Sequence, residues 1–315
     1  MKVVPLAADS LGVRSMATYV EVAGVGILID PGATLAPTRF NLPPAEEEWQ
    51  AFRRANDRIL SYGARAQFVF VSHYHEDHFH TNPATYAGRT VLLKDPRRMI
   101  QGQQARRAAE LWKSLTAVAK PTSADGAIHT EAGLSLEVSP PLGHGLEATP
   151  LGWVLALTIV DAAERERFVF ASDVQGPLSS VATAYLVRQR PTLLYLSGPP
   201  LYMEHKIGAD VIDRGIANLR RIIDATGCRV VMDHHAVRDM RTEARFAPLW
   251  ETGRVQTVAG FLGLPDAMLE RQRATLWGRA RKPAARAGAA PEAPAGRRAR
   301  MPWKPKRYAK GGTPE

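Results

Sequence analysis

The chain has 315 residues, of which 45% are hydrophobic, and this length supports one large domain with a sizeable buried core. No apolar run approaches the roughly 18–20 residues that a membrane-spanning helix requires, so we expect no membrane association. The N-terminus has no basic segment followed by a small-residue cleavage site, and the single cysteine, Cys228, can form no internal disulfide. Both observations favour a reducing compartment, and we expect a cytoplasmic protein.

The net charge of +10 is distributed unevenly along the chain. Residues 279–315 contain eleven Lys or Arg and two Glu, a net charge of +9, whereas residues 1–278 contain 30 basic and 29 acidic residues. The segment 279–315 is also poor in branched apolar side chains, so it cannot bury enough surface to offset its ordering entropy. We therefore expect one domain at 1–278, followed by a disordered basic tail at 279–315.

Alternating patterns and short apolar runs predict strands and helices in mixed order, which indicates an α/β fold. In the first half the expected strands are 2–6, 18–22, 25–30, 68–72, 90–93, 127–131 and 134–138, and the expected helices are 46–62 and 95–119. In the second half the expected strands are 154–160, 167–171, 193–196 and 229–232, and the expected helices are 178–189, 208–226 and 266–277.

The segment 68–78, FVFVSHYHEDH, organises the rest of the chain. Its apolar start has the length of a buried strand, and its end presents His73, His75, Asp77 and His78 within six residues. Because alternate side chains point the same way, His73 and His75 can bind one ion, and the next two residues can serve a second ion. Four of the nine histidines fall within residues 73–80, which a chance placement on polar loops does not explain.

Several of the expected strands end at a potential metal ligand. These strand-end residues are Asp30, His73, His144 (after a proline-rich turn), Asp173, and His234 or His235. Buried imidazoles and carboxylates are costly without partners, so they are usually matched to ions or hydrogen bonds. The pattern therefore predicts a metal site assembled from distant parts of the chain.

These motifs resemble those of the metallo-β-lactamase-fold hydrolases. The likeness covers residues 3 to about 238 and rests on SLGVRSMAT, LIDPG, VSHYHEDH, SPPLGHG, FVFASDVQGP and DHHAVRD. Within these hydrolases, the chain resembles a branch that is catalogued as an uncharacterised protein family and is often labelled predicted metal-dependent ribonuclease. The resemblance implies a four-layer αββα sandwich with two metal ions, usually zinc, at one edge of the paired sheets.

The resemblance also implies a ligand set, carried over by position. The implied ligands of one ion are His73, His75 and His144, those of the other are Asp77, His78 and a histidine of the 234–235 pair, and the implied bridge is Asp173. Three neutral nitrogens leave an open position for water, and two close ions lower the pKa of a shared water. We expect two divalent ions, with zinc preferred and manganese as the alternative.

The last motif leaves two histidines to choose between. His234 follows its strand by one residue and His235 by two, so their side chains should point in opposite directions. We prefer His234 as the ligand, because a position close to the rigid strand is better fixed. The alternative for either residue is a hydrogen bond that orients a ligand.

Four residues are candidates for contact with a substrate. Asp77 is a candidate catalytic residue as well as a ligand, and His205 is a candidate general acid. Arg14 and Ser15, in the first loop, could contact a phosphate. The alternative is that Ser15 satisfies backbone groups of a turn and Arg14 pairs with Asp9, while His205 is an exposed loop residue.

We expect a two-metal hydrolase that uses a metal-bound hydroxide on a phosphodiester, with RNA favoured as the nucleic-acid substrate. The basic tail, which carries Trp303 and Tyr308 among lysines and arginines, could add stacking and phosphate contacts. One alternative is a small-molecule hydrolase that cleaves a lactone, thioester or cyclic phosphodiester with the same metals. Another is a nucleic-acid-binding protein with structural metals, which the complete ligand set argues against.

Overall fold

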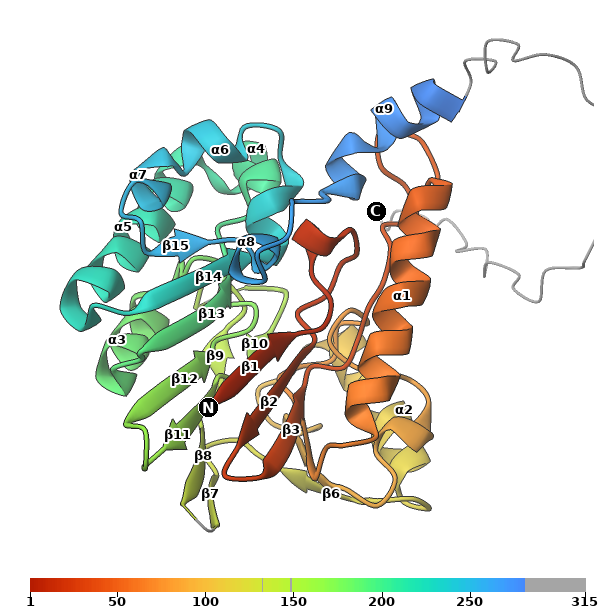
Figure 1. Ribbon diagram of the computed structural model, residues 1–315, viewed down its shortest axis with the longest axis vertical. Coiled ribbons are helices and arrows are strands. Elements are labelled where there is room, and N and C mark those ends of the chain that lie inside the picture. Colours follow the sequence, from red (N-terminus) through yellow and green to blue (C-terminus); the bar gives the residue numbers. More distant parts are fainter. Residues whose placement is uncertain (132, 148, 281–315) are drawn as a thin grey trace, which may run out of the picture.

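The computed structural model describes residues 1–131, 133–147 and 149–280 (Figure 1). The tail at 279–315, which was expected to be disordered, lies outside the described residues from 281 onwards, and residues 279–280 are the end of a helix. Two sheets face each other, and helices cover the outer face of each sheet, so the chain forms the four-layer αββα sandwich that the sequence predicts (Figure 1). Among the described residues, no helix is both long enough and apolar enough to cross a membrane.

The first sheet has six strands in sequence order. They are β1 (Lys2–Pro5), β2 (Thr18–Val22), β3 (Val25–Ile29), β4 (Phe68–Val71), β5 (Thr90–Leu93) and β6 (Lys120–Ser123). The first three pair antiparallel, and β3 to β6 pair in parallel. The parallel register brings the carboxyl ends of β3 and β4 to the same edge of the sheet.

The second sheet has seven strands in the order β15-β14-β13-β12-β11-β8-β7. They are β7 (Ile128–Glu131), β8 (Leu134–Val138), β11 (Leu157–Asp161), β12 (Glu166–Phe170), β13 (Leu193–Ser197), β14 (Arg229–Asp233) and β15 (Val255–Gln256). The strands from β12 to β15 are parallel, so β12 and β14 also end at one edge. A separate two-stranded ribbon is formed by β9 (Leu142–Gly143) and β10 (Trp153–Val154).

The helices divide between the two outer faces. The α-helices are α1 (Glu46–Gly63), α2 (Gly102–Leu115), α3 (Ser180–Gln189), α4 (Glu204–Ile207), α5 (Ala209–Thr226), α6 (Thr242–Arg245), α7 (Ala247–Trp250), α8 (Val258–Phe261) and α9 (Leu269–Ala280). The 3-10 helices are η1 (Asp9–Leu11), η2 (Pro83–Thr85), η3 (Leu201–Met203) and η4 (His234–Arg238).

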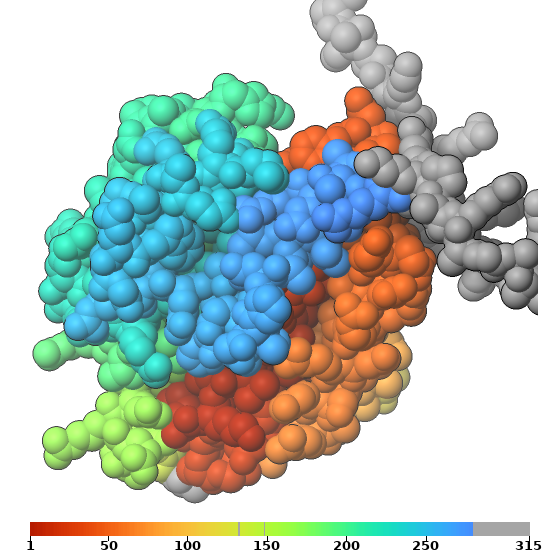
Figure 2. All heavy atoms as spheres, turned by 45° about the horizontal axis from the view of Figure 1, so that its top comes forward, coloured from red at the N-terminus to blue at the C-terminus, as the bar shows by residue number. Residues whose placement is uncertain are grey.

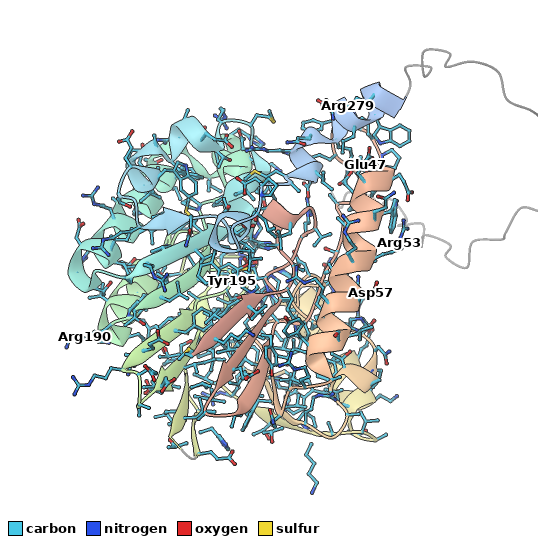
Figure 3. All side chains as sticks on the ribbon, in the orientation of Figure 1. Glu47, Arg53, Asp57, Arg190, Tyr195 and Arg279 are labelled. Carbon is cyan, nitrogen blue, oxygen red and sulfur yellow. The ribbon has the colours of Figure 1, made fainter. Side chains whose placement is uncertain are left out.

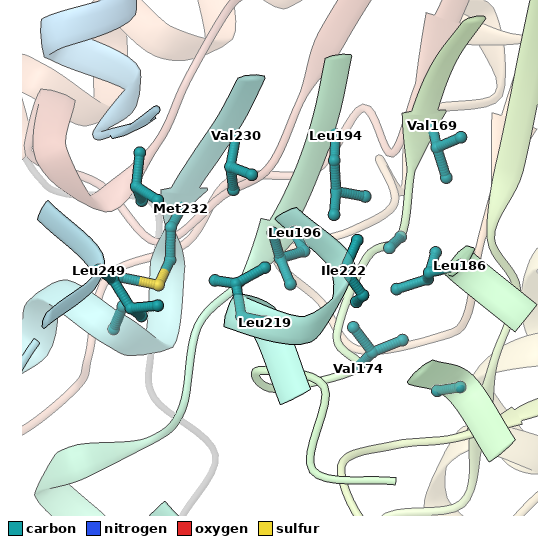
Figure 4. Packing of buried hydrophobic residues seen from close by; sticks show 14 of the residues in the cluster. Val169, Val174, Leu186, Leu194, Leu196, Leu219, Ile222, Val230, Met232 and Leu249 are labelled. Carbon is teal, nitrogen blue, oxygen red and sulfur yellow. The ribbon is translucent and has the colours of Figure 1, made fainter. Parts of the chain in front are cut away.

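Three hydrophobic clusters fill the spaces between the layers. The central cluster lies between the sheets and includes Ile29, Phe70 and Phe170. A second cluster packs α1 and α2 on the first sheet, and a third packs α3, α5 and α7 on the second. Figure 4 shows the third cluster, in which Leu194 and Leu196 of β13 and neighbouring strand residues face the helix residues Leu219 and Ile222. Burial on both faces explains the continuous apolar runs of the central strands.

The structure corrects some predicted elements. The helix predicted at 95–119 is shorter, because the Asp95 carboxylate accepts hydrogen bonds from the amides of Arg97 (2.8 Å) and Arg98 (2.9 Å) and closes a turn before α2. The sequence pattern did not predict β6, a polar strand at the sheet edge, or the short elements α6, α7, β15 and α8. Such short elements depend on tertiary contacts more than on local patterns.

The C-terminal helix α9 is anchored to α1 by a buried ion pair. The Arg273 guanidinium donates to both carboxylate oxygens of Glu48, at 2.8 and 2.7 Å, and both side chains are almost fully buried. Glu48 also accepts a hydrogen bond from the Ala45 amide at the start of α1 (2.9 Å). Figure 2 shows residues of α9 in blue against α1 in orange.

We predict that Arg273→Met destabilises the protein by about 3–5 kcal/mol, because it leaves the Glu48 carboxylate buried without its partner. Urea unfolding measures the loss. Arg53→Met is the matched control, because Arg53 pairs with Glu46 on the outer face of the same helix and is 59% exposed (Figure 3). The control should keep the wild-type urea midpoint, since exposed pairs are screened by solvent. Equal stability of the two variants would show that the buried pair does not hold α9.

Candidate metal centre

The candidate metal centre lies where strands of both sheets end. Asp30 follows β3, His73 follows β4 after Ser72, and Asp173 follows β12 after a two-residue connection. His144 follows β9, and His234 begins η4 directly after β14. All five are buried. The strand ends place side chains that are up to 204 positions apart in sequence beside one another.

One group of donors consists of His73, His75, His144 and Asp173. His75 Nδ1 lies 3.1 Å from His73 Nε2 and 3.1 Å from His144 Nε2. The Oδ2 atom of Asp173 lies 3.1 Å from His144 Nε2 and 3.6 Å from His73 Nε2. All four ligand atoms lie within 4.8 Å of one another, so one ion can contact them together.

A second group of donors consists of Asp77, His78 and His234. The Asp77 carboxylate is 3.5 Å from His234 Nε2 and 4.0 Å from His78 Nε2. Asp173 Oδ2 lies 3.3 Å from His78 Nε2, and Asp173 Oδ1 lies 3.6 Å from His234 Nε2. The Asp173 carboxylate therefore reaches both groups.

The residues fit divalent cations, and two orphaned buried atoms show why. Within residues 1–131, 133–147 and 149–280, His78 Nε2 and Asp173 Oδ1 are buried without a hydrogen-bond partner, although His78 Nε2 is at ion-pair distance from the other Asp173 oxygen. An unsatisfied buried polar atom costs about 1–3 kcal/mol. A cation between the groups would satisfy both atoms, and imidazole with carboxylate is a donor set suited to zinc.

Two outer carboxylates orient the histidines of the second group. Asp30 accepts from the Ser72 amide (2.7 Å) and lies 2.8 Å from His78 Nδ1, so it supports the loop as the resemblance implied. Asp9 lies 2.7 Å from His234 Nδ1. Because an ionised carboxylate only accepts, each Nδ1 carries a proton towards its carboxylate, and each Nε2 faces the centre, where the neutral ring can bind a cation.

Burial and neighbouring cations act in opposite directions on the carboxylates. Burial raises the pKa of Asp77, but His78, His234 and Arg238 outweigh it and hold that pKa below its usual value. Burial also raises the pKa of Asp173, which the surrounding histidines hold well below its usual value. Burial lowers the pKa of His75 to about 3. The carboxylates are thus ionised and His75 is neutral, which are the states that bind metals.

His235 lies at the same centre, with a different environment from His234. Its Nε2 is 3.4 Å from Asp173 Oδ2, while its Nδ1 is 2.7 Å from the Tyr202 hydroxyl and 3.2 Å from Arg238 Nη1. Asp9, Tyr202 and Arg238 are functional candidates that sequence reasoning missed. Each stands in a loop or a 3-10 helix with no periodic pattern, and only the DHHAVRD motif pointed towards Arg238.

The structure does not bring the predicted substrate-contact residues to the donors. Ser15 is buried and donates to the Gly32 carbonyl, so it satisfies a turn as the alternative stated. Arg14 forms a two-point ion pair with Glu270 (2.6 and 2.7 Å) instead of pairing with Asp9, whose partner is Arg238.

His205 is exposed on α4, and no hydrogen bond or ion pair joins it to the donors within the described part of the chain. The geometry therefore gives the predicted general acid no contact with the centre.

The four-layer αββα arrangement, with a His/Asp cluster at the strand ends, is the metallo-β-lactamase fold that the sequence motifs implied. No family model matches the chain. It nevertheless belongs to the UPF0282 protein family. It is 39% identical over 291 residues to the UPF0282 protein of Pyrococcus horikoshii, covering 88% of this chain and 92% of that protein. It is 37% identical over 295 residues to that of Methanopyrus kandleri, covering 88% of this chain and 99% of that protein.

Solved structures of other proteins show a more distant similarity. Tm1679, a metal-dependent hydrolase of the β-lactamase superfamily, has 13% identity and a TM-score of 0.49, covering 81% of this chain and 94% of its own. Zn²⁺-bound PqqB from Methylobacterium extorquens has 11% identity and a TM-score of 0.48, and the match covers 82% of this chain and 98% of PqqB. The short form of human tRNase Z has 13% identity and a TM-score of 0.44, and the match covers 74% of this chain and 92% of that protein. Such distant similarity assigns no substrate to this chain.

We predict about two divalent ions per chain in protein purified without chelators, because seven donors gather in more than one group that could hold an ion. His75→Ala removes a nitrogen of the first group and should leave about one ion or fewer, with a lower thermal midpoint. Elemental analysis and thermal unfolding measure both effects. His129→Ala is the control, because His129 lies on β7 outside both donor groups. A folded His75→Ala protein that retains two ions would exclude His75 as a ligand.

Proposed function

We propose that this protein is a binuclear-metal-dependent phosphodiesterase that acts on nucleic acid, with RNA favoured. The observation that supports this proposal most directly is the position of Asp173 between two groups of histidine and carboxylate donors. Asp173 Oδ2 faces the first group and His78, and Oδ1 faces His234, so this carboxylate is suited to hold two cations close together. Paired cations of this kind recur in phosphatases and nucleases.

We assign His73, His75 and His144 to one ion, and Asp77, His78 and His234 to the other. Zinc is the favoured metal because nitrogen donors dominate the first group, and manganese is the alternative. Bound divalent ions would supply Lewis acidity, a more acidic water and charge neutralisation for a phosphodiester. Asp173 would bridge the two ions.

Residues of the protein itself position the candidate ligands and supply charge at the centre. The ionised carboxylate of Asp77 lies 3.8 Å from Arg238 Nη2, and we retain Asp77 as the catalytic candidate because it is 17% exposed while His78 and His234 are fully buried. Asp9 and Asp30 hold the two buried rings with their Nε2 atoms towards Asp173. His205 is not part of this proposal, because it is exposed on α4.

Charge favours a polyanionic substrate over an uncharged lactone or thioester. The chain carries a net charge of +10, and most of the excess lies in residues 279–315, which also contain Trp303 and Tyr308. A segment of this composition binds nucleic acid through phosphate contacts and stacking, independently of the nucleotide sequence. Residues 1–278 would then carry out catalysis and residues 279–315 would bind the nucleic acid, so the two roles could be separated by deletion.

Asp173→Asn should slow the hydrolysis of bis(4-nitrophenyl) phosphate by at least about 100-fold, because the amide keeps the size of the carboxylate but loses the charge shared by two cations. Circular dichroism should show an intact fold. Asp57→Asn is the control, since Asp57 lies on the outer face of α1 (Figure 3). A rate within twofold of wild type would move the bridging role to another carboxylate. Turnover of a lactone by wild-type protein without turnover of the phosphodiester would favour the small-molecule alternative.

Deletion of 281–315, directly after α9, should leave turnover of the small phosphodiester unchanged, because all assigned ligands precede Arg238. The deleted segment carries ten Lys or Arg and two Glu, so RNA binding should weaken and depend less steeply on salt. Fluorescence anisotropy at several salt concentrations measures both changes. An unchanged affinity and salt slope would exclude the tail from substrate capture.

A further inference from the structure

The turn at residues 39–42, in the loop between β3 and α1, places an aromatic ring at an unusual backbone position. Arg39 and Leu42 exchange backbone hydrogen bonds of 3.0 and 2.9 Å, so Phe40 and Asn41 form the tip of the turn. Both tip residues have positive φ angles, 54° and 58°. Glycine and asparagine adopt this conformation readily, whereas a bulky side chain adopts it at a cost. Asparagine or glycine at position 40 would therefore suit the turn better than phenylalanine does.

Phe40 also contributes little to the hydrophobic core. It is 50% exposed and, within the residues that the structure describes, it belongs to none of the three hydrophobic clusters. Single exposed apolar side chains are common on protein surfaces. An exposed ring that also strains its own backbone, however, points to a function outside the fold.

The Phe40 ring is the outer end of a stack that begins at the candidate metal centre. His235, whose Nε2 lies 3.4 Å from Asp173 Oδ2, has the Tyr202 ring stacked on it at 5.9 Å with an interplanar angle of 23°. The Arg39 guanidinium lies 5.8 Å from the centroid of the Tyr202 ring and 4.9 Å from that of the Phe40 ring. Two rings, a guanidinium and a third ring thus follow one another from the centre to the surface.

The turn is also fixed to the C-terminal helix α9. Arg273 Nη1 donates to the Leu42 carbonyl at 3.1 Å, and the Trp277 indole N–H donates to the Pro43 carbonyl at 2.9 Å. The residues that follow α9 in sequence, 281–315, include ten Lys or Arg. The Phe40 turn is therefore held beside both the candidate metal centre and the helix that precedes the basic tail.

We propose that Phe40 is a nucleobase-stacking residue: an unpaired base of a single-stranded RNA, next to the phosphodiester at the Asp173 centre, stacks on its exposed ring. The Arg39 guanidinium covers one side of the ring, and the exposed part is open to another flat group. Base–aromatic stacking tolerates any sequence and needs a base free of its pairing partner, so the substrate is single-stranded. The inference rests on the proposed function for the identity of the strand as RNA.

The test measures binding of a labelled oligoadenylate, about 12 nucleotides long, by fluorescence anisotropy at several salt concentrations. Full-length protein carrying Asp173→Asn is used, because slow hydrolysis leaves the RNA intact. Adding Phe40→Asn removes the ring and should weaken binding about 10-fold, whereas Phe40→Trp should keep the affinity. The loss should be equal at every salt concentration, because stacking releases no counterions. The urea midpoint of Phe40→Asn should equal or exceed that of wild type, since asparagine suits the positive φ angle.

Two controls separate stacking from general effects. Ile128→Ala removes another exposed apolar side chain, 72% exposed on β7, and should leave oligoadenylate binding unchanged. A blunt RNA duplex of the same length should bind equally with and without Phe40→Asn, because its bases are paired. An unchanged oligoadenylate affinity in Phe40→Asn, an equal loss for the duplex, or a lowered urea midpoint would overturn the proposal.

A covalent readout locates the contact between ring and base. Ultraviolet irradiation of wild-type protein with a strand that contains bromouridine should crosslink the peptide that contains Phe40, as mass spectrometry would show. Crosslinks confined to residues 281–315 would overturn the proposal. Wild-type protein that hydrolyses no phosphodiester would contradict the proposed function, and the binding and crosslinking results would still decide the role of Phe40.

Discussion

The candidate metal centre depends on the Asp173 carboxylate, which is 2% exposed and surrounded by histidines from both sheets. A buried anion is stable only with compensating charge or hydrogen bonds, yet Asp173 Oδ1 has no hydrogen-bond partner among the residues that the structure describes. The surrounding nitrogens cannot all be protonated, since burial disfavours so many adjacent charges. Divalent cations resolve this conflict, because they neutralise the carboxylates and use the lone pairs of neutral rings.

The fold provides this constellation by ending strands of two sheets at one edge. The apolar cluster between the sheets fixes their separation, and the flanking clusters fix the helices outside them. Asp9 then orients the ring of His234, and Asp30 orients the ring of His78. Side chains with oriented neighbours lose less freedom on binding, so the centre is preorganised by its surroundings.

Contacts between the chain ends support one side of the centre. Helix α9 is held to α1 by Arg273 and Glu48, and Glu270 at its start binds Arg14 in the first loop. The same loop contains Asp9, which binds both His234 and Arg238. Asp9, which orients His234, thus comes from the beginning of the chain, 225 positions away.

The sequence by itself determined the αββα class and the residues that gather around Asp173, because strand periodicity and ligand spacing are local properties and the motifs resemble a known family. It left open the choice between His234 and His235, and it missed Asp9, Tyr202 and Arg238. It also left open whether Arg14 and Ser15 contact a substrate or hold the loop, and Glu270 and the Gly32 carbonyl are their partners. Only the tertiary structure shows these contacts, because the partners come from distant parts of the chain and no local pattern specifies them.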